Sequence, residues 1–156
     1  MDRYQVTGNE YISLPTIREA DGAVEGISCL YMQVKGMLEL KGREQFIKPC
    51  WAIDGQQQPL QPHWQRSHYW IPSFETKEEE AVFHCTYLAP VGERGFGIRL
   101  TAENTGRETK IIRVGLQGEW TQTLHTVNES LPLTEGLSVR ESGWNYMFIY
   151  QQTPGL

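Results

Sequence analysis

Residues 80–127 read EAVFHCTYLAPVGERGFGIRLTAENTGRETKIIRVGLQGEWTQTLHTV, and apolar residues alternate with polar ones along most of this segment. The clearest case is residues 96–102, where every second residue is apolar, which is the period of a half-buried strand. Gly-rich turns separate the apolar runs. The segment therefore predicts a consecutive antiparallel meander. A tight hairpin is expected at Glu103–Gly106, because Asn104 and Gly106 tolerate a left-handed backbone.

The same alternation recurs outside this segment. We expect further strands at residues 26–35, 37–40, 45–53, 67–74 and 144–151. The last of these is apolar on both faces, which predicts a place in the middle of a packed sheet. Pro49 lacks an amide donor, so its strand should lie at an edge or carry a bulge.

Turns and helices are predicted from local chemistry. Asp21-Gly22 and Asp54-Gly55 are turn signals. Residues 56–65, with two prolines and five glutamines, are expected to form a polar loop, and residues 75–80 a solvated turn. One short helix of one or two turns is expected at Pro15–Ala20.

These elements amount to roughly nine to eleven short strands at intervals of about 8–12 residues. The pattern predicts an all-β fold with little helix, an antiparallel β-sandwich that is either supersandwich-like or jelly-roll-like. A length of 156 residues predicts a single domain over residues 1–156. The sequence leaves open whether this domain is complete or the N-terminal part of a larger protein.

Composition narrows the class of partner. The formal net charge is −5 and no basic block occurs, so nucleic acid is not an expected partner. No apolar run approaches the roughly 18 residues of a membrane span, and the first ten residues lack the apolar core of a signal peptide. We therefore expect a cytoplasmic protein without a membrane partner or a cofactor; a homo-oligomer stays open. Three cysteines without CxxC spacing predict free thiols.

The histidines do not form a metal-binding pattern. His63, His68, His84 and His125 include no HxH or HxxxH pair, whereas two ligands from one strand need an i, i+2 spacing to share a face. His63 and His68 could still meet in space. The sequence predicts no metal site.

No catalytic set emerges from the other chemistry-bearing residues. A GxSxG nucleophile motif is missing, and the acidic residues Asp54, Glu103, Glu119 and Glu141 show no spacing that pairs two of them. Residues 92–97, GERGFG, superficially resemble a phosphate-binding loop, but a strand follows instead of a helix, which predicts a turn. We assign no catalytic residue.

The segment 61–70 carries the best candidates for ligand contact. Sugars stack their C–H faces on aromatic rings and bond their hydroxyls to amides and charges. The candidate carbohydrate-binding residues are His63, Trp64, Arg66, Tyr69 and Trp70. Burial of these aromatic residues, or docking through them, is the alternative interpretation.

Four runs within the predicted meander resemble a known family. They are Thr86–Pro90, Glu93–Phe96, Arg99–Gly106 and Val114–Trp120. Together they are similar to the N-terminal β-sandwich of bacterial glycogen-debranching and glucoamylase-type glycoside hydrolases. The resemblance implies an accessory domain that packs against a helical, toroidal catalytic domain and helps to shape its substrate cleft. Because the catalytic carboxylates of that family lie in the helical domain, it assigns none to this chain.

Three hypotheses follow. The leading one is a non-catalytic accessory β-sandwich domain of a carbohydrate-active protein acting on α-glucans, with a helical catalytic domain or carbohydrate as its partner. The second is a free-standing carbohydrate-binding module that uses Trp64, Tyr69 and Trp70. The third is a small jelly-roll, metal-dependent enzyme that uses His63, His68 or His84.

Overall fold

The computed structural model describes residues 3–31, 36–127, 137–142 and 146–151, and all regular secondary structure in these ranges is β-strand. The strands are β1 (Tyr4–Gly8), β2 (Ile12–Arg18), β3 (Gly26–Tyr31), β4 (Gly36–Lys41), β5 (Ile47–Ile53), β6 (Gln56–Gln57), β7 (His63–Ser67), β8 (Ile71–Glu78), β9 (Ala81–Leu88), β10 (Gly97–Asn104), β11 (Ile112–Gly118), β12 (Gln122–Val127), β13 (Leu137–Ser142) and β14 (Tyr146–Gln151). Every pairing is antiparallel. The predicted all-β antiparallel fold is confirmed.

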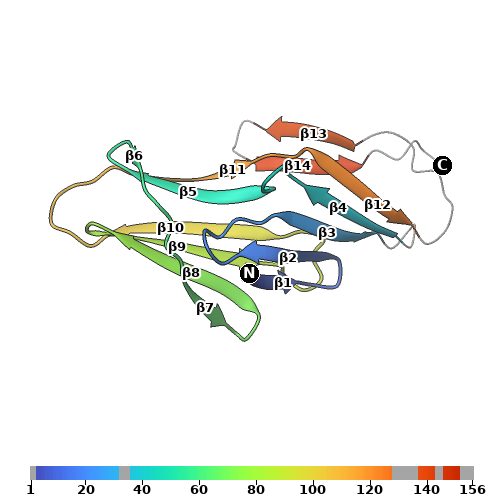
Figure 1. Ribbon diagram of the computed structural model, residues 1–156, viewed down its shortest axis with the longest axis horizontal. Helices are drawn as coiled ribbons and strands as arrows, with labels where there is room; N and C mark the ends of the chain where they lie inside the picture. The colour runs from blue at the N-terminus through green and yellow to red at the C-terminus, as the bar shows by residue number, and fades with distance from the viewer. Residues whose placement is uncertain (1–2, 32–35, 128–136, 143–145, 152–156) are drawn as a thin grey trace.

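The strands form two facing layers (Figure 1). One layer contains the sheet β1-β2-β3-β4-β12 and the sheet β11-β5-β6. Val24 links these two sheets, because its backbone amide donates to the carbonyl oxygen of Ile47 and its own carbonyl accepts from Phe46, each at 2.8 Å. The other layer is the sheet β10-β9-β8-β7. Strands β13 and β14 pair with each other in a separate hairpin.

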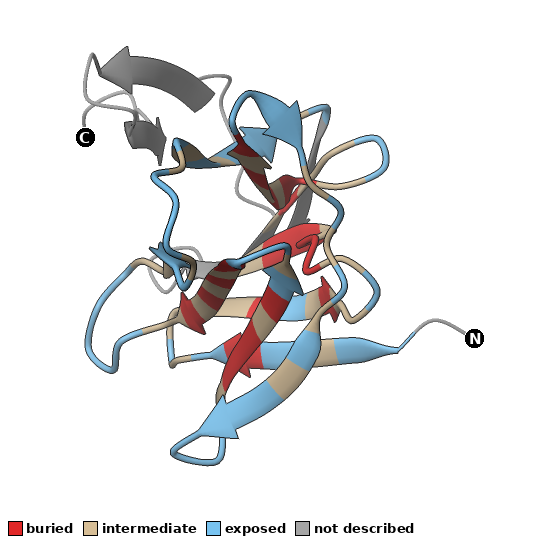
Figure 2. Ribbon diagram, turned by 90° about the vertical axis from the view of Figure 1, so that its left-hand side faces the viewer, coloured by how far each residue is buried: buried red, intermediate tan, exposed pale blue. Residues whose placement is uncertain are grey.

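The core lies between the layers and is built by period-two alternation. Every second residue of β5 and of β9 is buried, which places one face of each strand inward (Figure 2). Trp51 from β5 stacks on Phe83 from β9, with ring centroids 5.5 Å apart. Burying a large apolar side chain stabilises a fold by about 1.5–3 kcal/mol. This pair therefore fixes the distance between the layers.

One turn reaches across the same core. Gly22, in the predicted Asp21-Gly22 turn, has a φ of +70°, and its carbonyl oxygen accepts a hydrogen bond from the buried hydroxyl of Tyr87 on β9. Burial raises the pKa of Tyr87 well above its usual value, so the hydroxyl stays protonated and acts as the donor. The connection between β2 and β3 is thereby attached to the opposite layer.

The predicted meander over residues 80–127 is correct only in its first half. β9 and β10 pair along eight residues, but β11 pairs with β5 and β12 with β4. The tight hairpin predicted at Glu103–Gly106 is therefore wrong: the chain crosses between layers there. The side-chain oxygen of Asn104 accepts from the amide of Gly106 at 3.0 Å, so the local turn chemistry is used without a strand pairing.

The helix predicted at Pro15–Ala20 is also wrong. Most of this segment belongs to β2, whose residues Ile12, Leu14 and Ile17 are buried. The register between β1 and β2 shifts so that Val6 lies across from both Pro15 and Thr16. A bulge at this place accommodates the proline, which has no amide to donate to the ladder.

Two predicted segments between residues 56 and 80 are divided differently in the structure. Residues 56–65 are not one loop, because β6 pairs with β5 and β7 begins at His63. Residues 67–74 are not one strand either, since residues 68–70 turn the chain between β7 and β8. β8 then runs to Glu78, so the turn predicted at 75–80 is reduced to Glu79 and Glu80.

Pro49 lies where β5 is paired on one side only, although β5 as a whole lies between β11 and β6; among the described strands, the last strand is not in the middle of a sheet. β5 pairs with β11 along its whole length without a bulge, but with β6 only at Ala52 and Ile53. β5 therefore has an open edge at Pro49. β14 pairs with β13 alone among the described strands. Trp144 lies outside the described residues.

Candidate functional site

The five predicted carbohydrate-binding residues lie on one hairpin but not on one surface. His63, Trp64 and Arg66 belong to β7, and Tyr69 and Trp70 belong to the turn that joins β7 to β8. Because neighbouring residues of a strand point to opposite faces, Trp64 and Arg66 share a face that excludes His63. The structure thus divides the predicted set into an inward group, one outward histidine and an aromatic tip.

Trp64 points into the molecule. Its indole nitrogen Nε1 donates a hydrogen bond to the backbone oxygen of Glu19 at 2.8 Å. Its ring lies edge-on to Phe74 at 5.0 Å and stacks on Tyr87 at 6.1 Å between centroids. Such contacts satisfy the polar atom of the indole and pack part of its ring against the core. The structure therefore places Trp64 with the core and away from Tyr69 and Trp70.

Arg66 links the two layers at their edge. Its Nε and one terminal nitrogen donate to the Oε1 atom of Gln5 on β1, at 2.9 and 2.7 Å. His63 is exposed on the outer face of the sheet. In this arrangement the guanidinium group holds β7 beside β1, and its paired donors are already engaged.

Tyr69 and Trp70 form an exposed aromatic tip. The Tyr69 side chain is 89% exposed and that of Trp70 is 62% exposed. The backbone is in the left-handed region at both His68 (φ 51°) and Tyr69 (φ 69°). A bulky residue rarely adopts this conformation, and such positions cluster at ligand-binding sites. The tip therefore combines a left-handed turn with two exposed aromatic side chains.

The predicted histidines are distributed over the sheet and its tip. His63, Glu75 and His84 lie side by side on β7, β8 and β9, on the same outer face. The Nδ1 atom of His84 is 4.0 Å from Glu75 Oε2. His68 lies in the turn at the end of the hairpin. In the described part of the chain, no group of three His, Cys, Asp or Glu side chains is arranged to hold a metal ion.

The acidic residues weighed for catalysis lie in separate parts of the fold. Asp54, in the confirmed Asp54-Gly55 turn, accepts a hydrogen bond from the amide of Ile111 at 2.9 Å. Glu103 and Glu119 are exposed. The GERGFG segment forms the predicted turn, in which Gly92 has a φ of +83°.

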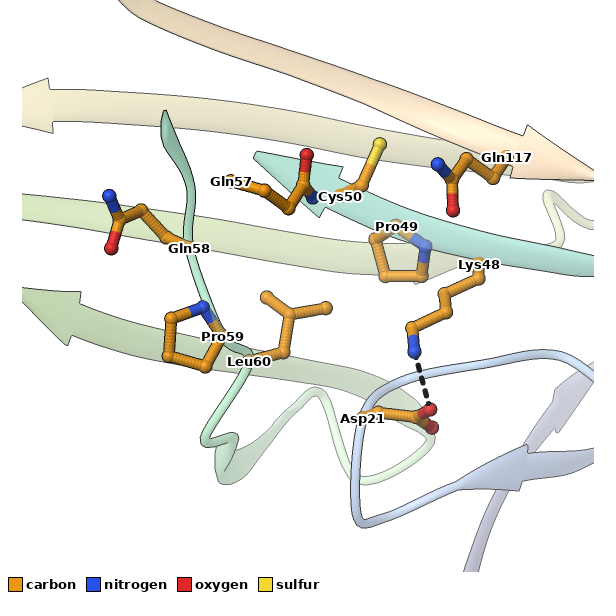
Figure 3. Close-up of a pocket in the computed structure, with 9 residues that line it drawn as sticks. All are labelled: Asp21, Lys48, Pro49, Cys50, Gln57, Gln58, Pro59, Leu60 and Gln117. Atoms are coloured by element: carbon orange, nitrogen blue, oxygen red, sulfur yellow. Dashed lines mark ion pairs between the residues drawn. The ribbon is translucent and has the colours of Figure 1, made fainter. Parts of the chain in front are cut away.

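A cavity of about 480 Å³ opens between β5, the end of β11, the segment after β6 and the β2–β3 connection (Figure 3). Its lining consists of Asp21, Lys48, Pro49, Cys50, Gln57, Gln58, Pro59, Leu60 and Gln117. Sequence reasoning missed this site. The run QQQPLQP was the available signal, because polar amides next to rigid prolines are typical of a shaped wall as well as of a loop.

An ion-pair network forms one end of the cavity. Asp21 Oδ2 lies 3.0 Å from Lys48 Nζ and 2.8 Å from a terminal nitrogen of Arg18, whose Nε donates to Oδ1 at 2.8 Å. Burial alone would raise the pKa of Asp21, but the hydrogen bonds from Arg18 and Lys48 outweigh it and lower the pKa to about 2. The carboxylate is therefore ionised at neutral pH and holds the Lys48 ammonium at the rim.

The three cysteine thiols are free, and burial raises the pKa of each. Cys29, Cys50 and Cys85 are free thiols, as predicted. Burial raises the pKa of Cys85 to about 12, and it also raises the pKa of Cys29 and of Cys50, which lines the cavity. All three thiols are therefore poor nucleophiles at neutral pH.

Two side chains on the inward-facing side of β11 are partly open to solvent. Val114 and Leu116 lie opposite Trp51 and Pro49 of β5, so they share the face on which β5 is buried. Nevertheless Val114 is 42% exposed and Leu116 is 47% exposed. We call these two side chains the β11 face. β10, the last strand of the opposite sheet among the described strands, contacts β11 but leaves these two side chains partly exposed.

Comparison of the chain with protein-family models, with curated proteins and with solved structures found no match. The resemblance to the N-terminal domain of glycogen-debranching and glucoamylase-type enzymes therefore stays a prediction. Within the described ranges, no helix has the length and apolarity needed to cross a membrane.

Proposed function

We propose that this chain is a non-catalytic β-sandwich domain of a carbohydrate-active protein with an α-glucan substrate, and that it packs against a helical catalytic domain and helps to position the substrate. The observation that carries the proposal is the β11 face. Val114 and Leu116 continue the core face of the β11-β5-β6 sheet, yet nothing in the described chain covers them fully. Apolar surface of this kind is stabilised when another domain buries it.

The position of the β11 face supports docking of a separate body. β11 and β10 both lie at sheet edges in the described chain, and Ile98 and Leu100 of β10 pack only partly against the core. Bare edges and half-buried apolar residues are features that free-standing sandwiches normally avoid. A helix with an apolar stripe would cover the β11 face without adding a strand to the sheet.

The proposal is tested with paired lysine variants in the product of the complete reading frame. Val114→Lys combined with Leu116→Lys should change the free energy of unfolding of the isolated 1–156 chain by less than about 0.5 kcal/mol for each exposed site. The same change should separate the sandwich from its neighbouring domain, seen as two thermal transitions in place of one, and lower the hydrolysis of α-glucan.

Val91→Lys is the matched control. Val91 is 82% exposed in the β9–β10 turn, so it tests the effect of an added charge away from the β11 face. It should leave both the single transition and the hydrolysis unchanged. Equal behaviour of the two variants would contradict docking through the β11 face.

A second candidate function is carbohydrate binding by the domain itself through the aromatic tip. The observation that favours it is the exposure of Tyr69 and Trp70 on a left-handed turn. Calorimetry with α-glucans tests it: Trp70→Ala should abolish the heat of binding, whereas Trp64→Ala should lower stability through loss of core packing. Unchanged α-glucan binding by Trp70→Ala would refute a role for the tip.

A further inference from the structure

The cavity beside β5 has the composition of a ligand site and plays no part in the docking or tip contacts described above. We propose that it binds a small neutral polyhydroxylated molecule, a mono- or disaccharide. Its volume of about 480 Å³ lies within the roughly 300–1,000 Å³ range of small-molecule sites. The choice of an α-glucoside as the probe rests on the proposed function. The class of ligand, a neutral polyhydroxylated molecule, is inferred from the residues that line the cavity.

Two of the side-chain amides that line the cavity belong to Gln57 and Gln117. The side chains of Gln57 and Gln117 make no hydrogen bond to any residue in the described chain, and they approach the cavity from different strands, β6 and β11. A primary amide offers two donors and one acceptor, which matches a vicinal pair of hydroxyl groups. Gln58 adds a third amide, whose Nε2 is partly engaged by the carbonyl of Gln56 at 3.1 Å.

The electrostatics of the cavity favour a neutral ligand over an anion. Lys48 supplies the one ammonium group of the lining, and Asp21 already pairs with it at 3.0 Å. Both oxygens of Asp21 are occupied by Arg18, Lys48 and the amide of Ala23. A phosphate or carboxylate would have to compete with Asp21 for Lys48. A hydroxyl oxygen can instead accept a hydrogen bond from one of the remaining N–H groups of the ammonium without breaking the pair.

The rest of the wall is apolar and preorganised. Pro49, Pro59 and Leu60 form it, and Figure 3 shows the Leu60 side chain directed toward Pro49. The indole Nε1 of Trp51 donates to the carbonyl oxygen of Pro59 at 3.3 Å, which anchors the segment to β5. An apolar wall facing amides suits a molecule with a C–H face and a hydroxyl edge, and a fixed wall lowers the entropic cost of binding.

The test is an NMR titration of the 1–156 chain with maltose, followed at the side-chain amide resonances of Gln57 and Gln117. Maltose should shift both resonances. Gln57→Ala and Gln117→Ala should each raise the Kd for maltose by about 3- to 10-fold, which is the effect expected from the loss of one neutral hydrogen bond. Gln65→Ala, an exposed amide on β7, is the matched control and should leave the Kd unchanged. Glucose 6-phosphate should bind no better than glucose.

A second readout uses Cys50, which lines the same cavity. In a Cys29→Ser background, saturating maltose should slow alkylation of Cys50 by iodoacetamide at least about 3-fold. The cavity site would be overturned if maltose bound with the same Kd in Gln57→Ala and Gln117→Ala and did not slow alkylation of Cys50. Loss of that binding in Trp70→Ala would then support sugar binding at the tip. If the wild type bound no maltose, the cavity site would be overturned. Docking through the β11 face would be unaffected, because the lysine variants test it separately.

Discussion

Asp21 is the residue at which the turn after β2, the strand β5 and the cavity meet. Its carboxylate accepts hydrogen bonds from Arg18 and from Lys48, and its side chain is 18% exposed. These donors lower its pKa from 3.8 to about 2, against the effect of burial. The folded state therefore binds this proton less tightly than the unfolded chain does. The resulting stability is fully present above about pH 4 and is lost as the pH falls through the folded pKa near 2.

Asp21→Asn should lower the free energy of unfolding by about 2 kcal/mol at pH 7, because a shift from 3.8 to about 2 corresponds to that amount. The gap between wild type and variant should narrow to roughly half by pH 3, where the unfolded wild type is largely protonated. Urea unfolding at both pH values measures it. Glu93→Gln, which removes an exposed carboxylate in the β9–β10 turn, serves as the control. A constant gap for Asp21→Asn would contradict the pKa assignment.

Tyr69 has a backbone conformation that is unfavourable for a tyrosine and costs stability. Its φ of 69° disfavours a tyrosine, and its ring is 89% exposed. Tyr69→Asn should therefore raise the free energy of unfolding by about 0.5–1 kcal/mol, because asparagine tolerates this backbone better. Trp70→Asn, at a neighbouring exposed position without a positive φ, should give no such gain. A loss of stability in Tyr69→Asn would mean that the tyrosine ring supports the turn.

At the scale of elements, the β2–β3 connection holds the two layers together through the contact of Gly22 with Tyr87. A Cβ atom added at Gly22 would lie 2.5 Å from Cε1 of Phe74 and 2.7 Å from the Tyr87 hydroxyl. Both neighbours belong to fully buried aromatic side chains, which close packing keeps in place. The same position has a φ of +70°, which disfavours any L side chain.

Gly22→Ala should consequently cost roughly 3–5 kcal/mol, the range expected when steric overlap in the core adds to backbone strain. Gly55→Ala is the matched control, because Gly55 has a φ of +85° but no atom within 4 Å of the added Cβ. It should cost only about 1 kcal/mol from the backbone. Thermal unfolding of both variants compares them, and equal losses would show that the contact with Phe74 and Tyr87 is unimportant.

Strand content was predictable because alternation is a local property. The patterns of β5, β9 and β10 can be recognised in the sequence, and so can the Asp54-Gly55 turn. Pairing was less predictable, because it depends on contacts between distant segments. The turn chemistry at Asn104 fits a hairpin, yet β11 pairs with β5, whose buried residues outweigh the local preference.

The helix expected at Pro15–Ala20 failed for a related reason. Its residues have no strong helical periodicity, and the burial of Leu14 and Ile17 in a sheet decided their conformation. The proline that suggested a helix start lies instead in a bulge of β2. The local signal at this proline thus assigned the wrong element to the segment.

At the scale of the whole molecule, the candidate sites depend on the assembly of the layers. The aromatic tip was predicted as part of one run, and the structure keeps Tyr69 and Trp70 exposed while it buries much of Trp64. The cavity joins Asp21, Lys48 and Gln117, which are far apart in the sequence. No spacing rule could have joined them, because their proximity follows from the pairing of β11 with β5 and from the ion pair across the turn.

The central claim is that the β11 face is an interface within a larger carbohydrate-active protein. Hydrogen–deuterium exchange of residues 112–118 tests it directly, in the isolated 1–156 chain and in the product of the complete reading frame. We expect exchange at β11 to slow at least about 10-fold in the complete product, while residues 68–70 at the tip exchange equally in both. Equal exchange at β11 in the two proteins, or a reading frame that encodes no further domain, would contradict the account.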